Sequence, residues 1–169
     1  MPPHTQLTPP TKVIGSPSSS TSYTPRSAVR IIAFNPQGHI AILHAARDNY
    51  YKLPGGGVEP GEDHETAARR EFLEETGGVI RLRRDLKYND EFRLQQCQTS
   101  YCYVADLVSD TGRTALEEEE VEDGLKHMWV SLDEARRLVE GAVPGSEFGR
   151  SVREREMHFL REIGRVLGS

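Results

Sequence analysis

The sequence has few cysteines, no long apolar run and no excess of positive charge, and each shortage argues against a class of protein. Its 169 residues include two cysteines, Cys97 and Cys102, which are too few for a disulfide framework. On an extended strand they would lie too far apart to form a bridge, so we expect free thiols. No stretch is apolar enough to span a bilayer or to resemble a secretory signal. A net charge of −5 argues against a general nucleic-acid binder.

Residues 1–26 lack acidic side chains altogether, although they contain six prolines and many serines and threonines. Such a composition cannot bury enough surface to offset the entropy of ordering, so we expect a disordered tail. Residues 27–169 then form one domain. A mitochondrial transit peptide is the alternative for the tail, but Lys12 and Arg26 are its only basic residues apart from a histidine. We therefore expect a cytoplasmic protein.

A glycine-rich turn joined to an acidic helix is the main feature that the sequence does contain. Three consecutive glycines at 55–57 let the backbone bend sharply or approach a ligand closely. Residues 64–76 consist mostly of strong helix formers. Asp63 is placed to cap the start of this helix, and Gly77 to end it.

Three glutamates lie close together on one side of the predicted helix. Glu71, Glu74 and Glu75 have the spacing i, i+3 and i+4, at which like charges repel each other. Carboxylate oxygens are the ligands that Mg²⁺ or Mn²⁺ prefers, so a bound cation would remove the repulsion. The alternative is a solvated acidic face that pairs with Arg69 and Arg70.

The spacing of these residues resembles the Nudix box of the Nudix hydrolases. Five residues separate Gly56 from Glu62, and seven more precede the segment REFLEETG at 70–77. One position departs from the family pattern, because Gly78 stands where an aliphatic residue is expected. The resemblance covers residues 27–167, although only the box is specific.

The resemblance implies a Nudix fold, which is an α/β/α sandwich with a mixed central sheet. It also implies a pyrophosphohydrolase that uses Mg²⁺, or alternatively Mn²⁺, to cleave a phosphoanhydride bond of a nucleoside di- or triphosphate derivative. Water would attack phosphorus. The implied catalytic residues are Glu71, Arg70, Glu74 and Glu75, and the implied metal ligands are the three glutamates together with Gly56.

A dense acidic run, LEEEEVED at 116–123, follows later in the chain. We expect most of it to be a solvated loop. Many Nudix enzymes nevertheless take one further glutamate from this region as a metal ligand or general base. The candidates are Glu118, Glu119, Glu120 and Glu122. Glu120 represents this group among the predicted metal ligands, and the general base is either Glu71 or one of these glutamates.

In Nudix proteins the strand before the box lies beside the substrate, which suggests residues that contact it. The candidates for substrate binding are Arg30, Arg47, Gly55, Gly56 and Tyr103. Tyr103 has a ring that can stack on a nucleobase. For the arginines and the tyrosine, the alternative is an ordinary surface or packing role.

Alternating and buried apolar patterns predict the remaining elements. The predicted strands are residues 27–34, 39–45, 50–53, 79–86, 91–94, 98–108 and 127–130. Ser131 is placed to cap a following helix, and residues 148–167 form a terminal amphipathic helix. The resemblance to Nudix domains implies that Trp129 packs in the core.

The sequence leaves the substrate open. Subfamilies that act on ADP-ribose or diadenosine polyphosphates often carry proline or tyrosine near residues 91–95, and this chain has neither there. A nucleoside triphosphate or a modified nucleotide, such as an oxidised purine, is therefore favoured. We expect a small-molecule partner without stable nucleic-acid or membrane association, and we leave a homodimer open. The alternative functions are a non-catalytic Nudix module that binds a nucleotide, and a scaffold that uses its acidic loop and tail.

Overall fold

The computed structural model describes residues 12–93 and 95–167, without the side chains of residues 84–89. In this part of the chain eight strands form one sheet in the order β1-β6-β7-β2-β3-β4, with β5 paired to β2 and β8 paired to β3. The pairs β1–β6 and β2–β7 are parallel and the others are antiparallel, which confirms the mixed sheet. The strands are β1 (Lys12–Ile14), β2 (Thr24–Phe34), β3 (Ile40–Ala45), β4 (Tyr50–Lys52), β5 (Gly55–Gly57), β6 (Gly78–Arg93), β7 (Gln96–Asp110) and β8 (Leu125–Val130).

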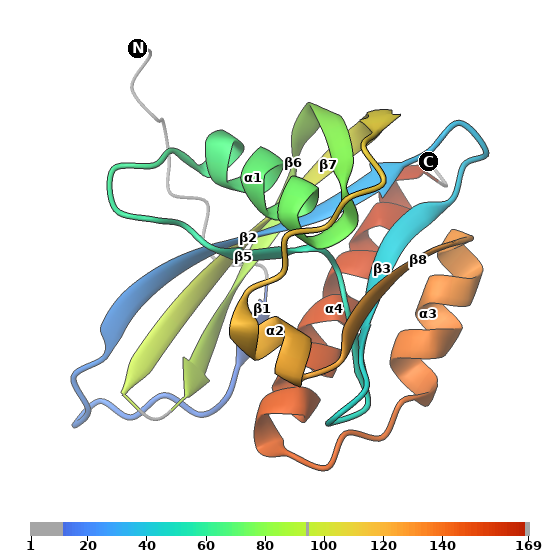
Figure 1. Cartoon of the computed structure of the whole chain (residues 1–169). Helices are drawn as coiled ribbons and strands as arrows, with labels where there is room; N and C mark the ends of the chain where they lie inside the picture. The colour runs from blue at the N-terminus through green and yellow to red at the C-terminus, as the bar shows by residue number, and fades with distance from the viewer. Residues whose placement is uncertain (1–11, 94, 168–169) are drawn as a thin grey trace.

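Helices cover both faces of the sheet, as Figure 1 shows. Helix α1 (His64–Thr76) lies on one face, whereas α3 (Leu132–Gly141) and α4 (Glu147–Leu167) lie on the other. A short helix, α2 (Glu118–Glu122), precedes β8. The expected α/β/α sandwich is confirmed.

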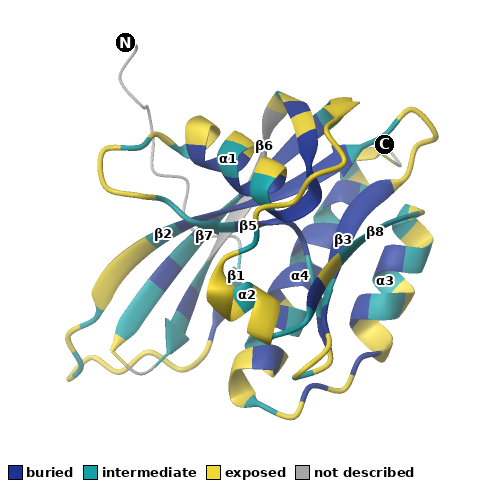
Figure 2. Cartoon of the chain, in the orientation of Figure 1, coloured by how far each residue is buried: buried dark blue, intermediate teal, exposed yellow. Residues whose placement is uncertain are grey.

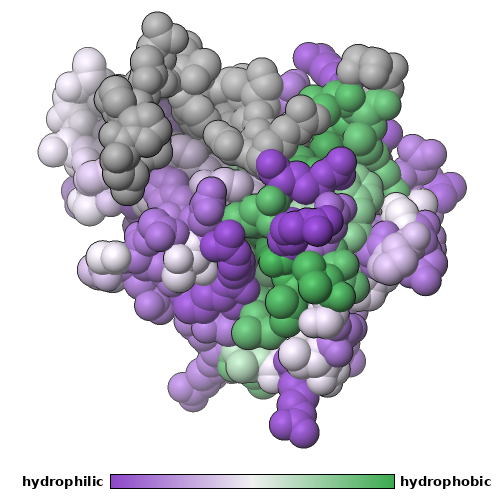
Figure 3. All heavy atoms as spheres, turned by 90° about the horizontal axis from the view of Figure 1, so that it is seen from above, coloured by the Kyte–Doolittle hydropathy of each residue, from purple (hydrophilic) through white to green (hydrophobic). Residues whose placement is uncertain are grey.

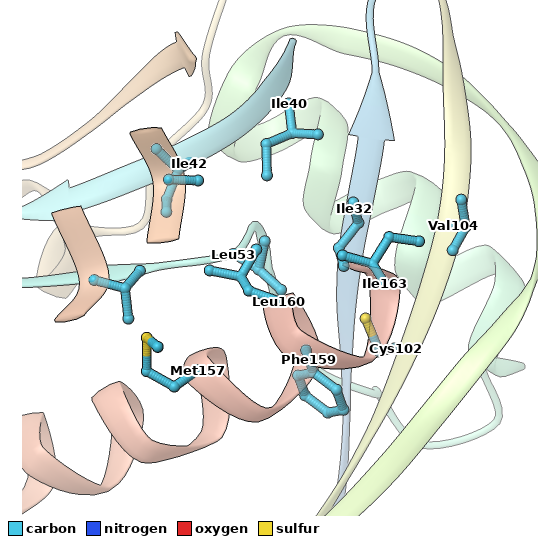
Figure 4. Close-up of a cluster of buried hydrophobic side chains, with 12 residues drawn as sticks. Ile32, Ile40, Ile42, Leu53, Cys102, Val104, Met157, Phe159, Leu160 and Ile163 are labelled. Atoms are coloured by element: carbon cyan, nitrogen blue, oxygen red, sulfur yellow. The ribbon is translucent and has the colours of Figure 1, made fainter. Parts of the chain in front are cut away.

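The sheet separates two apolar clusters because successive strand residues point to opposite faces. Ile31 of β2 packs with Phe72 under α1. Its neighbour Ile32 packs with Phe159 and Leu160 of α4 in the cluster drawn in Figure 4. Figure 2 shows the central strands buried between the helical layers. The sheet therefore forms a rigid base for the loop and helix that carry the acidic residues.

Local sequence signals set both ends of α1. The Asp63 carboxylate accepts a hydrogen bond of 2.7 Å from the Thr66 N–H, and Gly77 ends the helix at a φ of 79°. Both caps were predicted. A Cβ on Gly78 would lie 2.5 Å from the Phe72 ring. The departure from the family pattern at this position therefore has a packing reason.

Three elements differ from the expectation. The predicted strands 79–86 and 91–94 form one strand, β6. It pairs with β7 along its length, and the pairing register shifts at three points. The glycine turn contains a short strand, β5, because it pairs with β2. The acidic run, expected to be a loop, includes α2. Each difference depends on pairing or capping that residue type alone does not specify.

Ordered structure begins before residue 27. Strand β1 pairs in parallel with β6, and its residue Ile14 is only 2% exposed. Strand β2 begins at Thr24. Part of the segment expected to be a tail thus contributes to the sheet, and residues 1–11 lie outside the described residues.

Several features of the surface and the thiols complete the fold. Cys97 and Cys102 are free, as expected. No described helix is long and apolar enough to cross a membrane. A band of apolar side chains bordered by hydrophilic ones appears on the face seen in Figure 3.

Candidate active site

The three glutamates of α1 lie on the side of the helix that faces the glycine strand. Glu71 and Glu75 are buried, at 8% and 1% exposure, and Glu74 is partly buried. One guanidinium nitrogen, Nη1 of Arg70, lies 3.0 Å from Glu71 Oε1 and 3.3 Å from Glu74 Oε2. Because a single donor reaches both carboxylates, the two groups converge rather than point to different sides.

Arg70 is fixed by the loop that precedes α1. Its Nε and Nη2 donate hydrogen bonds of 2.7 and 2.9 Å to the two carboxylate oxygens of Glu62. Its Nη2 also donates to the Gly57 carbonyl oxygen at 3.1 Å. The hydrogen bonds from Arg70 lower the pKa of Glu62 to about 2. This bidentate pair between Arg70 and Glu62 connects the loop to the helix and positions the guanidinium against Glu71 and Glu74.

The glycine strand β5 approaches the carboxylates so closely that side chains would not fit. A Cβ on Gly56 would lie 2.6 Å from Glu71 Oε1. Gly55 adopts a φ of 147°, and a Cβ there would lie 1.9 Å from the Val29 carbonyl oxygen. The absence of side chains therefore lets the backbone of Gly55 and Gly56 lie directly against the acidic cluster.

Glu75 is the most enclosed of the three carboxylates. Its Oε2 accepts a hydrogen bond of 2.9 Å from the Gly55 N–H, and its Oε1 lies 2.9 Å from Lys52 Nζ. Burial raises the pKa of Glu75 to about 8, opposed by the charge of Lys52 and assisted by a hydrogen bond with the Glu120 carboxyl group. Lys52 was not predicted as a site residue. The sequence feature that could have indicated Lys52 is its position two residues before Pro54, just ahead of the glycine strand.

Helix α2 brings one glutamate of the acidic run to the site. The capping box of α2 fixes Glu120, whose Oε1 accepts a hydrogen bond of 2.9 Å from the Glu117 N–H. Glu120 is the member of the run that contacts Glu75. The pKa of Glu74 is raised mainly by burial and further by the charges of Glu117 and Glu120. The fold thus selects among glutamates that the sequence could not distinguish.

A cavity of about 280 Å³ opens beside these carboxylates. Its lining residues are Glu75, Thr114, Leu116, Leu125, Lys126 and His127. The cavity lies between the end of α1 and the start of β8. It offers space for a small group next to Glu75.

The donor set has the chemistry of a site for a hard divalent cation. Glutamate oxygens and the exposed backbone of Gly56 are the oxygen ligands that Mg²⁺ prefers. Among the described residues, however, no three such side chains converge on one point that could hold an ion. Instead, Arg70 and Lys52 contribute the positive charge that the carboxylates require. A metal would therefore bind by competing with cations of the chain itself.

The structure separates the predicted substrate-binding residues into two groups. Arg30 lies in register with Gly55 on the neighbouring strand, but its buried side chain projects to the opposite face of the sheet from Ile31, toward Arg155 of α4. Arg47 is exposed near Asp123 in the segment between β3 and β4, with 3.9 Å between Nη1 and Oδ1. Tyr103 is 9% exposed and packs in the apolar cluster under α1. Tyr103 therefore has a packing role in this structure, which was the alternative interpretation.

A buried ionic cluster lies next to Arg30 and was not predicted. Arg155 of α4 donates hydrogen bonds of 2.9 Å to Glu91 Oε1 and 2.7 Å to Glu156 Oε1. Burial, followed by the charge of Arg155, lowers the pKa of Arg30 to about 10. Nε and Nη1 of Arg30 have no hydrogen-bond partner among the described residues. Glu91 Oε2 and Glu156 Oε2 also lack a hydrogen-bond partner among the described residues, so Arg30 belongs to a buried group of charges on the α4 face of the sheet.

Comparison with known proteins decides the family. The model of the NUDIX domain matches residues 24–149, which is most of the chain. The protein belongs to the Nudix family. The glycine strand, the Arg70–Glu62 pair and the glutamates of α1 are thus the Nudix box of this chain in three dimensions.

Individual Nudix relatives agree with this assignment. The RNA pyrophosphohydrolase of Wolbachia sp. subsp. Brugia malayi (strain TRS) is 47% identical over 53 residues, which cover 31% of this chain and 33% of the relative. The RNA pyrophosphohydrolase of Caulobacter vibrioides (strain NA1000 / CB15N) is 44% identical over 55 residues and 32% of its length. The alignments thus span about a third of these relatives.

Solved structures show the same fold over a larger part of the chain. The MutT protein from Methanosarcina mazei Go1 superposes with a TM-score of 0.59 and 20% identity, and covers 85% of this chain and 99% of that one. The C. elegans Ap4A hydrolase has a TM-score of 0.57 and 19% identity, with the same coverage. At these identities the likeness concerns the Nudix fold alone.

Proposed function

We propose that this protein is a Mg²⁺-dependent pyrophosphohydrolase that cleaves a phosphoanhydride bond of a nucleoside di- or triphosphate derivative. The observation that carries the proposal is the convergence of Glu71 and Glu74 on one guanidinium nitrogen, with Gly56 packed against the first carboxylate. Glu75 and Glu120 extend this acidic cluster. Membership of the Nudix family supports the same chemistry.

The metal would be held by Glu71, Glu74 and Glu75, with Glu120 and the Gly56 backbone close by. When bound, Mg²⁺ or Mn²⁺ supplies positive charge that offsets the charge developing on the phosphoryl oxygens and the leaving group. The chain itself must position these ligands and accept a proton from the attacking water. Glu71 or Glu120 accepts that proton in our proposal.

Two arginines have distinct roles in the proposed reaction. Arg70 orients the carboxylates through its pair with Glu62 and does not need to touch the substrate. Arg30 is buried beside Arg155 on the α4 face of the sheet, which favours the packing role that was its alternative. Arg47 is exposed and remains the arginine proposed for a phosphate oxygen of the substrate.

The proposed substrate is a nucleoside triphosphate or a modified nucleotide. The relatives named RNA pyrophosphohydrolase add the 5′-triphosphate end of RNA as a second class, because it contains the same phosphoanhydride bonds. The net charge of −5 favours the small nucleotide. A cytoplasmic location stays a prediction, and a homodimer stays open.

The test is a substrate panel with matched variants. Purified protein is incubated with Mg²⁺ and nucleoside triphosphates, oxidised purine nucleotides or 5′-triphosphate RNA, and released phosphate and pyrophosphate are measured. E74Q should lower the rate by about 100-fold or more, because it removes a carboxylate where the metal would bind. E65Q changes an exposed glutamate of the same helix, whose Oε2 lies 3.6 Å from Arg69 Nη2, and should retain activity within about twofold.

The outcome also separates the alternative functions. Binding of a nucleotide without any Mg²⁺-dependent product would refute hydrolysis and favour a non-catalytic module. A scaffold would show neither binding nor product. The intact set of box glutamates favours the enzyme.

A further inference from the structure

We propose that Lys52 occupies the metal site as an internal cation. It donates a hydrogen bond to Glu75 while the metal is absent, and its ammonium group would leave that carboxyl group once a divalent cation is bound there. The inference rests on the proposed function, because it requires that the box carboxylates bind a metal. It accounts for the absence of a preformed metal-binding group among the described residues.

Lys52 occupies the position that a small cation would take beside Glu75. Its Nζ lies 2.9 Å from Glu75 Oε1 and 3.3 Å from the Gly55 carbonyl oxygen. The Lys52 side chain is only 14% exposed and that of Glu75 only 1%. A carboxylate and a backbone carbonyl are ligands that a divalent cation also uses. The ammonium group and a metal would therefore compete for the same oxygens.

Lys52 is easier to displace than the other cation of the site. Arg70 donates two hydrogen bonds to Glu62 and one to the Gly57 carbonyl oxygen. It also donates to two glutamates of its own helix α1. Among the described residues, Lys52 donates two hydrogen bonds, and it has a flexible four-carbon stem. Entry of a metal can move its ammonium group without disturbing the connection between loop and helix.

The cavity beside Glu75 gives the released ammonium group a destination. Leu43 of β3 pairs with Lys52 on one side and with His127 on the other. Residues directly opposite each other on neighbouring strands project from the same face of the sheet. His127, Lys126 and Glu75 line the cavity of about 280 Å³. Lys52 thus projects from the same face of the sheet as His127, which lines this cavity beside Glu75.

Calorimetric titration of Mg²⁺ into substrate-free protein tests the competition. The titration is carried out at pH 9, above the pKa of about 8 of Glu75, so that protons compete little. K52M should bind Mg²⁺ about tenfold more tightly than the wild type, which corresponds to about 1.4 kcal/mol. K52R keeps the charge and should bind within about threefold of the wild type. Circular dichroism verifies that each variant is folded.

Lys126 provides a matched control for long-range charge. It lines the same cavity, so K126M removes the same charge without removing the direct pair with Glu75. We expect its Mg²⁺ affinity to stay within about twofold of the wild type. Equal tightening in K126M and K52M, or unchanged affinity in K52M, would overturn the role of Lys52 while leaving the proposed hydrolase intact. Failure of the wild type to bind Mg²⁺ or release phosphate would overturn both.

A crystal structure of the Mg²⁺-loaded wild type gives a second readout that needs no variant. We expect more than 4.0 Å between Lys52 Nζ and the Glu75 carboxylate, which is beyond the distance of an ion pair. A pair that remains at 2.9 Å beside a bound metal would refute the displacement directly.

Discussion

Replacing Gly56 by alanine should damage catalysis while sparing the fold. The added Cβ would lie 2.6 Å from Glu71 Oε1 and 2.7 Å from its other carboxylate oxygen, whereas a contact of 3.0–3.4 Å is already tight. The Glu71 carboxylate must therefore move by about 0.4 to 0.8 Å. A misplacement of about 1 Å at a reacting centre can cost about 100-fold in rate, or about 2.7 kcal/mol of activation free energy.

The stability cost of the same change should be small. Gly56 does not have a positive φ, so alanine fits its backbone, and the atoms it meets are at the end of a side chain. We expect the free energy of unfolding to change by about 1 kcal/mol or less. Initial rates of phosphate release at saturating Mg²⁺ and chemical denaturation of the same preparation measure the two effects.

Gly57 offers a matched control for this prediction. Its added Cβ would also lie 2.6 Å from a side-chain atom, but that atom is Nη2 of Arg26, which is exposed and outside the proposed catalytic set. G57A should retain activity within about twofold. If G56A kept the full rate, or if both variants lost the same activity, the contact between Gly56 and Glu71 would not be what positions the carboxylate.

Two further predictions concern buried charges. Because the folded protein holds a proton on Glu75 up to a pKa of about 8 and the unfolded chain releases it near its ordinary value of 4.5, metal-free stability should fall as pH rises from about 5 to 8. E75Q should flatten this slope in denaturation curves measured with EDTA, and an unchanged slope would contradict the assignment. R155M removes the hydrogen-bond partner of buried Glu91 and Glu156, leaves Arg93 3.8 Å from Glu91, and should lower the free energy of unfolding by about 3–5 kcal/mol. A loss below about 1 kcal/mol by urea denaturation would show that the two carboxylates find other compensation.

The sequence predicted the parts of the site that depend on local periodicity. Helical spacing placed Glu71 and Glu74 on one side of α1, and the residues Asp63 and Gly77 marked its ends because capping needs only neighbours along the chain. Alternation of apolar residues located most strands, including β3 and β7, to within a few residues. The family and the fold class came from the resemblance to the Nudix box, and the family model confirms that resemblance.

Other features were decided only when distant segments came together. Lys52 and Glu75 are paired although 23 positions separate them in the sequence. Glu120 reaches Glu75 because the fold places α2 beside the site. Arg155 and Glu91 are paired although 64 positions separate them. Residue type and spacing cannot specify such pairs, because many charged residues have the same local pattern and only packing of the sheet and helices selects among them. The sequence by itself thus determined the helix, its acidic face and the family, whereas the tertiary structure decided which cations neutralise that face.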